Sequence, residues 1–125
     1  MHDQLSEQII GAAFKVHNSL GFGFLESVYE KALSIELNKL GIIHQRQSPI
    51  NVYYEEQLVG EFTCDLLVTG SLIVELKSVA VLAPVHEVQL VNYLVATRID
   101  VGLLINFGPT KVEVKRKFRN FNPGN

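Results

Sequence analysis

Two acidic residues and a lysine are spaced so that one β-hairpin could carry all three on one face. Glu75 and Lys77 are two residues apart in the apolar run 72–77, and Asp65 lies ten residues before Glu75. Side chains two apart on a strand point to the same face of a sheet. If the intervening turn is centred on Gly70, Asp65 faces Glu75, and facing residues have Cβ atoms roughly 4.5–5.5 Å apart.

This cluster has the chemistry of a divalent-cation site. Opposed carboxylates repel each other, and a cation would offset that repulsion. Mg²⁺ commonly takes one or two carboxylates together with water and substrate phosphate oxygens, and it can polarise a phosphoryl group. A nearby Lys77 could orient the attacking water or neutralise developing charge. The alternative is that Asp65 and Glu75 are solvated polar positions, although charges in so apolar a strand are expected to be paired or coordinated.

The elements that position the cluster follow from the spacing of apolar residues. Up to Gly41 they recur every three or four positions, which is typical of helices, and the pattern then changes to that of strands. We expect helices at about 4–20, 25–40 and 85–97, and strands at about 50–54, 57–68, 72–77, 101–107 and 111–118.

This order of elements defines a fold class. Three consecutive strands form a meander, and the strand–helix–strand unit at 72–107 is expected to be a right-handed parallel crossover. The run 101–107 is almost wholly apolar, as in a central strand, whereas 111–118 alternates with charges, as in an edge strand. The sequence therefore predicts an α/β fold with a mixed β-sheet flanked by helices, in the order α-α-β-β-β-α-β-β.

The helix expected at 85–97 has an almost continuous apolar coat, so we expect it to be well buried. Its polar stripe consists of His86, Gln89 and Tyr93 at the spacing i, i+3, i+7. That stripe could be the solvent face of the helix, or it could face the carboxylates. Both interpretations stay open from the sequence.

Length and composition are those of an ordinary globular domain. The chain has 125 residues, about the size of one domain, and 47% hydrophobic residues, which argues against disorder. It has no apolar run of the roughly 20 residues that cross a bilayer, and its start lacks a signal-peptide layout. The single cysteine, Cys64, excludes an internal disulfide and a multi-cysteine zinc site. We therefore expect a cytoplasmic protein without a membrane partner.

Positive charge is concentrated late in the chain. The formal charge of −2 argues against a strongly basic nucleic-acid binder, yet residues 111–125 hold five Lys or Arg and one acid. Lys115 and Lys117 share one face of the strand expected at 111–118. They could contact phosphates, which would contribute salt-dependent affinity. Equally, they could be the solvated face of an edge strand.

Asp65, then nine residues, then Glu75-Leu76-Lys77 resembles the motif of the PD-(D/E)xK nuclease superfamily. The proline of that name is absent, since Thr63 and Cys64 precede Asp65. The order of elements over about residues 25–107 is also similar to the superfamily core. The resemblance implies a restriction-endonuclease-like core.

A narrower resemblance covers more of the chain. The run 23–29, Gly-Phe-Leu-Glu-Ser-Val-Tyr, resembles the signature of the bacterial GxxExxY proteins. Together the two resemblances imply one nuclease-like domain over 1–125. The additions to its core are the helix at 4–20 and the basic strand at 111–118.

The superfamily resemblance implies roles for individual residues. Asp65 and Glu75 would bind the metal, with the carbonyl of Leu76 as a further ligand. Lys77 would orient the attacking water or stabilise the transition state. Glu26 would complete the metal site directly or through water.

Other residues are candidates for contact with the substrate. Gln89 matches a glutamine that contacts the substrate or the site in the superfamily. Tyr29 shares a helix face with Glu26 and is either a core residue or a stacking residue. The full set of nucleic-acid contact candidates is Tyr29, His86, Tyr93, Lys115 and Lys117.

The function these expectations define is a metal-dependent nuclease that uses Mg²⁺, or Mn²⁺ in its place. Its partner would be a nucleic acid, with DNA favoured over RNA. So small a core leaves little room for recognition, which favours low specificity, a homodimer or a targeting partner protein. The alternative is a non-catalytic module of the same fold that binds nucleic acid or protein.

Overall fold

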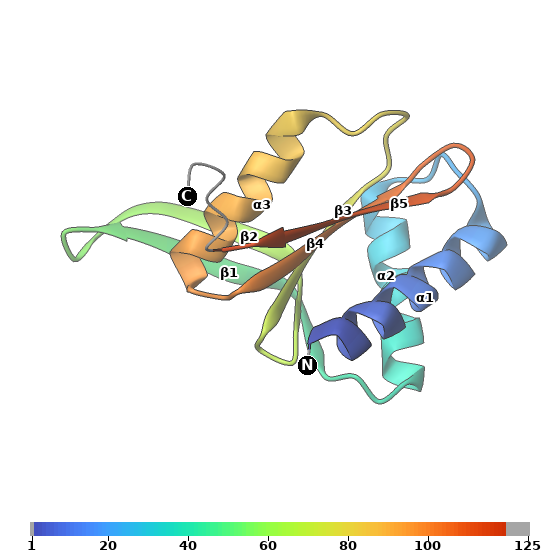
Figure 1. Ribbon diagram of the computed structural model, residues 1–125, viewed down its shortest axis with the longest axis horizontal. Helices are drawn as coiled ribbons and strands as arrows, with labels where there is room; N and C mark the ends of the chain where they lie inside the picture. Colours follow the sequence, from blue (N-terminus) through green and yellow to red (C-terminus); the bar gives the residue numbers. More distant parts are fainter. Residues whose placement is uncertain (1, 120–125) are drawn as a thin grey trace.

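The computed structural model describes residues 2–119, and Figure 1 shows how the helices and strands of that part of the chain are arranged. They are α1 (His2–Leu20), α2 (Glu26–Lys39), β1 (His44–Tyr54), β2 (Gln57–Val68), β3 (Leu72–Lys77), α3 (Pro84–Thr97), β4 (Val101–Phe107) and β5 (Val112–Phe118). No helix in this part of the chain is long and apolar enough to cross a membrane.

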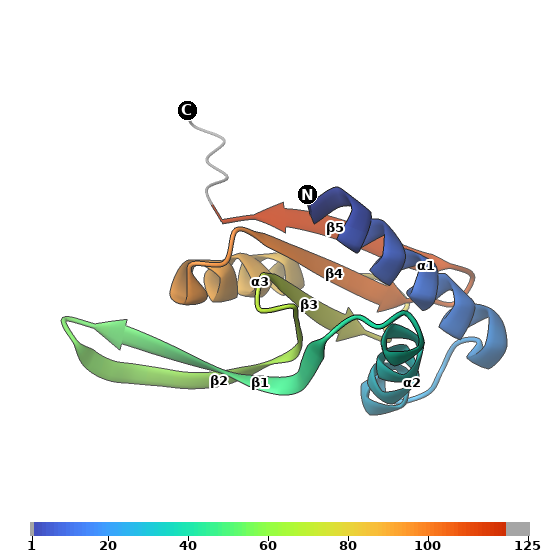
Figure 2. The same ribbon diagram turned by 90° about the horizontal axis from the view of Figure 1, so that it is seen from below.

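The five strands form one mixed sheet in the order β1-β2-β3-β4-β5. β3 and β4 pair in parallel through the α3 crossover, and the other neighbours pair antiparallel. The helices α1 and α2 lie on one side of the sheet and α3 lies on the other (Figures 1 and 2). The expected α/β fold, with a restriction-endonuclease-like order of elements, is confirmed.

The sheet separates two clusters of buried apolar side chains. In β3, Leu72, Val74 and Leu76 pack in the larger cluster beneath α1 and α2, whereas Ile73 packs in the smaller one against α3. Each of these four side chains is fully buried, and such burial contributes about 1.5–3 kcal/mol per side chain. Strand alternation then places Glu75 on the same side as Ile73, beside α3.

The sequence placed most element boundaries correctly, and β1 is the main exception. It begins at His44, about six residues before the expected strand at 50–54. Residues 44–49 are mostly polar and contain Pro49, so they lack the apolar pattern of a strand. Because β1 lies at the edge of the sheet, it tolerates a proline and exposed polar side chains.

The expectation that α3 is well buried was wrong. Only Leu90, Tyr93 and Leu94 of α3 are buried, and its valines at 85, 88 and 95 are 57–64% exposed. The helix is apolar on both sides, so its composition could not show which side meets the sheet.

The β1–β2 hairpin extends beyond the sheet as a two-stranded arm, which we define as residues 49–63. β2 pairs with β3 only between Leu66 and Val68. Figure 2 shows the arm curving away from β3 and running past one end of α3. The arm therefore runs beside α3 instead of continuing the central sheet, and its Ile50 packs in the α3 cluster.

Candidate metal centre

The two carboxylates lie where β2 and β3 separate. The turn at Gly70 sets the expected register, which pairs Val68 with Leu72 and continues toward Asp65 and Glu75. The Asp65 backbone N–H donates to Glu75 Oε2 at 2.6 Å, and the Leu76 N–H donates to Asp65 Oδ2 at 2.8 Å. Each carboxylate thus accepts a backbone hydrogen bond from the opposite strand, which fixes both groups in the gap.

Burial and mutual repulsion disfavour two negative charges at this position. Glu75 is 7% exposed, and burial followed by the charge of Asp65 raises its pKa to about 8. The pKa of Asp65 is also raised, chiefly by burial, although the Leu76 N–H and Lys77 oppose the shift. The positive charge near Asp65 and Glu75 is therefore too small to balance two ionised carboxylates.

This donor set fits a hard divalent cation. Two carboxylates and the Leu76 carbonyl are all oxygen donors, and Mg²⁺ usually takes one or two carboxylates and leaves its other positions to water and phosphate. Within residues 2–119, no group of three or more His, Cys, Asp and Glu side chains is arranged to hold a metal ion. A centre here would accordingly depend on Asp65 and Glu75.

Glu26 lies at the edge of this arrangement. It is the first residue of α2 and is exposed, and its charge contributes to the raised pKa of Glu75. An acid in the first turn is also favourable for the helix itself. Its role as a further metal ligand stays a prediction.

Glu30 and Gln47 lie beside Asp65, although the sequence indicated neither as a site residue. Gln47 Nε2 donates to Glu30 Oε1 at 2.5 Å and to Asp65 Oδ1 at 3.3 Å, and Arg46 Nε donates to Glu30 Oε2 at 3.0 Å. Glu30 is 5% exposed. The one sequence signal for Glu30 was its position four residues after Glu26, which places both side chains on the same face of a helix. Gln47 reaches Asp65 from a left-handed backbone, with φ of 51°, which no local pattern indicated.

Tyr29 is a core residue, which corrects its candidacy as a nucleic-acid contact. Its side chain has no solvent exposure and stacks on Phe107 with ring centroids 4.3 Å apart. Its hydroxyl donates to the Gly21 carbonyl at 2.5 Å. Because the ring is enclosed, no base can stack on it. Tyr29 instead fixes the turn that leads into Glu26.

The segment after Lys77 is anchored from two sides. Ser78 Oγ donates to the Phe24 carbonyl at 2.9 Å, beside the start of α2. The fully buried Asn106 accepts from the Val79 N–H and donates to the Val79 carbonyl, both at 2.9 Å. These bonds hold the end of β3, and with it Lys77, against α2 and β4.

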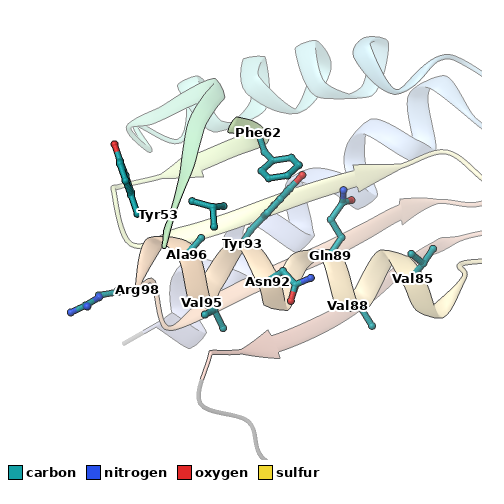
Figure 3. Close-up of a pocket in the computed structure, with 11 residues that line it drawn as sticks. Tyr53, Phe62, Val85, Val88, Gln89, Asn92, Tyr93, Val95, Ala96 and Arg98 are labelled. Atoms are coloured by element: carbon teal, nitrogen blue, oxygen red, sulfur yellow. The ribbon is translucent and has the colours of Figure 1, made fainter. Parts of the chain in front are cut away.

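The three polar residues of α3 have different surroundings. His86 Nδ1 accepts from the Ala83 N–H at 3.2 Å and so caps the helix start. Tyr93 is 7% exposed and lies beside Phe62 of the arm, whereas Gln89 is exposed and lies on the same side of α3 (Figure 3). Of the three, Gln89 is the most accessible to a substrate.

The two lysines of β5 also differ. Lys117 Nζ forms an ion pair with Glu87 of α3 at 2.5 Å, and Lys115 is exposed. β5 is the sheet edge opposite β1, as expected of the basic strand. The ion pair gives Lys117 a role in joining β5 to α3.

Comparisons with known proteins agree with this fold. The sequence model of the PD-(D/E)XK nuclease superfamily matches residues 3–117, so the chain belongs to this superfamily. No curated protein matches the chain.

Among solved structures, the crystal structure of SSO0001 is similar, with a TM-score of 0.57 and 13% sequence identity. The match covers 78% of this chain and 52% of SSO0001, so this chain spans about half of that protein's length. At this identity the likeness concerns the fold alone.

Proposed function

We propose that the protein is a metal-dependent nuclease that hydrolyses phosphodiester bonds of nucleic acid. The observation that carries the proposal is the pair Asp65 and Glu75, fixed in the gap between β2 and β3 with too little positive charge around it. Membership of a nuclease superfamily supports it. So does the narrower resemblance of residues 23–29 to the GxxExxY proteins.

We assign the residues the roles that the superfamily resemblance implies. Asp65, Glu75 and the Leu76 carbonyl would hold Mg²⁺ or Mn²⁺, and Glu26 would support this site directly or through water. Such an ion would polarise the phosphoryl group and lower the pKa of water. Lys77, held by the anchored segment behind it, would orient the attacking water or balance charge in the transition state. Gln89 would contact the substrate.

The proposal favours DNA over RNA as the substrate, and the surroundings supply few contacts for sequence recognition. A second copy or a targeting partner protein would provide recognition that the core lacks. The alternative, a non-catalytic binding module, has one observation in its favour. The backbone hydrogen bonds to Asp65 and Glu75 could hold β2 and β3 together without any metal.

A cleavage assay separates these functions. Circular and linear duplex DNA, single-stranded DNA and RNA would be incubated with Mg²⁺ or Mn²⁺ and wild type, Glu75→Gln or Lys77→Ala. We expect cleavage that a chelator abolishes and that each variant slows at least about a hundredfold, the scale for loss of one electrostatic group. Two exposed residues give the matched controls, Glu7→Gln and Lys31→Ala, which should cleave normally.

Two outcomes would contradict the proposal. If folded Glu75→Gln cleaves at the wild-type rate, the carboxylate of Glu75 is not needed for cleavage. Absence of cleavage on every substrate, with nucleic acid still bound, would favour the binding module.

A further inference from the structure

A groove of about 800 Å³ lies between the arm and α3 (Figure 3). Its volume is within the range of sites that bind small organic groups. Its lining combines aliphatic side chains, Val52 of the arm and the valines and alanine of α3, with residues that carry rings or polar groups: Tyr53, Phe62, Gln89, Asn92, Tyr93 and Arg98. Tyr93 and Ala96 of the α3 cluster form part of its floor, and the rest of the groove is open to solvent.

Aromatic rings form one wall of the groove. Phe62 is 47% exposed and Tyr53 is 61% exposed, although both are large aromatic side chains. The Phe62 ring lies 5.8 Å from that of Tyr93, at an interplanar angle of 41°. Gly60 leaves space for Phe62, because a Cβ at Gly60 would be 2.9 Å from the ring. Open aromatic surfaces of this kind stack on nucleobases.

Amide side chains lie on the helix side of the groove. Gln89 and Asn92 are exposed on α3, and each amide offers both donors and an acceptor. Amides pair in this way with the edges of bases, which offer complementary groups. Rings and amides in one groove therefore suit a flat heterocycle with polar edges.

The groove and the candidate metal centre share α3 and β2. Tyr93 and Phe62 line the groove, and Tyr93 packs in the α3 cluster with Cys64, which directly precedes Asp65 in β2. α3 returns antiparallel to β3, which places its first turn beside the end of β3, where Lys77 lies. Arg98 follows the last turn, about 21 Å further along the 14-residue helix.

The charges around the groove favour a single strand over a duplex. Among the lining residues Arg98 is the one cation, and the exposed acids Glu55, Glu56 and Glu61 lie on the arm. A duplex is bound mainly through many phosphate contacts from Lys and Arg. Stacking of unpaired bases on open rings contributes about 1–3 kcal/mol per base, so it supplies affinity that a single cation does not.

We propose that the groove binds unpaired bases, and that the substrate of the carboxylate centre is single-stranded or locally unpaired nucleic acid. This inference rests on the proposed function for the cleavage step, whereas binding of the strand can be measured independently. Bases would stack on Phe62 and Tyr53, with Gln89 and Asn92 at their edges. Lys77 and Arg98 would lie near the phosphates at the two ends of the groove.

The test is fluorescence anisotropy in a chelator, where no metal-dependent cleavage occurs. The probes are a labelled DNA strand of about 12 nucleotides, the same strand with abasic sites in its centre, and the matching duplex. We expect wild type to bind the intact strand most tightly, with a shallow salt dependence that reflects one or two phosphate contacts. Phe62→Ala and Tyr53→Ala should each weaken binding about tenfold.

Phe14→Ala is the matched control, because Phe14 is 44% exposed on α1, across the sheet from the groove. It should bind the strand as wild type does. The proposal would be overturned by equal binding of the abasic strand, by unchanged binding in both folded groove variants, or by no binding of the strand to wild type. A wild-type dimer that Phe62→Ala converts to a monomer would show that a second copy fills the groove, and would overturn it too.

Addition of Mn²⁺ to the same strand separates this inference from the proposed function. A strand that binds through Phe62 and is never cut would contradict the nuclease and leave the groove assignment standing. If wild type and Phe62→Ala bind the strand equally and cleave it at the same rate, the groove assignment would be contradicted and the nuclease would stand.

Discussion

Glu75 is held in surroundings that favour its protonated form. The side chain is 7% exposed, it faces Asp65, and the backbone N–H of Asp65 and the charge of Lys77 only partly compensate. A buried acid without a full counter-charge costs stability whenever it ionises. The residue is therefore better suited to binding a cation than to strengthening the fold.

The pH dependence of stability follows from this. In the unfolded chain Glu75 ionises near the ordinary glutamate pKa of 4.5, whereas in the folded chain it keeps its proton up to a pKa of about 8. Between these values the folded state holds more protons, so the free energy of unfolding falls as pH rises. Metal-free protein should melt lower at about pH 8.5 than at about pH 6, by roughly 4 °C for each kcal/mol lost.

Thermal melts in a chelator would measure this effect. Glu75→Gln should melt at similar temperatures at both pH values, because the titrating group is gone. Glu61→Gln, at an exposed position, should keep the wild-type dependence. A wild-type melting temperature that rises over this range, or a Glu75→Gln variant as pH-sensitive as wild type, would contradict the assignment.

The sequence could predict part of this site. Gly70 fixed the turn, the turn fixed the register, and the register brought Asp65 to Glu75. The contacts of Gln47 could not be predicted, because they depend on a left-handed residue within β1. The alternation of side chains between the two faces of β2 is also interrupted near Asp65. Cys64 and Leu66 are two residues apart and should share a face, yet Cys64 packs in the α3 cluster and Leu66 in the α1–α2 cluster.

At the scale of elements, the packing of α3 on β4 depends on one glycine. A Cβ added at Gly102 would lie 2.8 Å from Cδ1 and 3.1 Å from Cγ of Leu90, which is fully buried in α3. Neither the helix nor the central strand has room to move without disturbing its other contacts.

Gly102→Ala should therefore destabilise the protein by about 1–3 kcal/mol, the usual cost of overpacking. Gly11→Ala is the matched control with the opposite sign. No atom lies within 4 Å of a Cβ at Gly11, and alanine is the better helix residue, so α1 should gain about 0.5–1 kcal/mol. Urea denaturation would measure both changes. A Gly102→Ala variant as stable as wild type would contradict the packing described.

Element boundaries could be predicted where glycine, proline or a change of period marked them. The helix α2 ends before Gly41 and α3 begins at Pro84, as expected. The early start of β1 could not be predicted, because its first residues contact solvent at the sheet edge. The exposure of α3 could not be predicted either. Its exposed side lines the groove, and the other wall of the groove is the arm, which is distant in the sequence.

At the scale of the whole molecule, the carboxylates lie where β2 and β3 separate, near α2 on one side and α3 on the other. The larger cluster under α1 and α2 contributes most buried apolar side chains. The α3 side has the smaller cluster, and there the arm and helix leave a groove beside the carboxylates. A metal ion and a strand could therefore bind without rearrangement of the main core.

Titration calorimetry of Mn²⁺ into the metal-free protein at about pH 7.5 tests the central claim most directly. Metal binding must displace the proton held on Glu75, so the affinity should rise with pH. We predict saturable binding to wild type, normal binding to Glu61→Gln, and loss of binding in both Asp65→Asn and Glu75→Gln. Equal binding by wild type and folded Glu75→Gln, or no binding by wild type, would contradict a metal centre at these carboxylates.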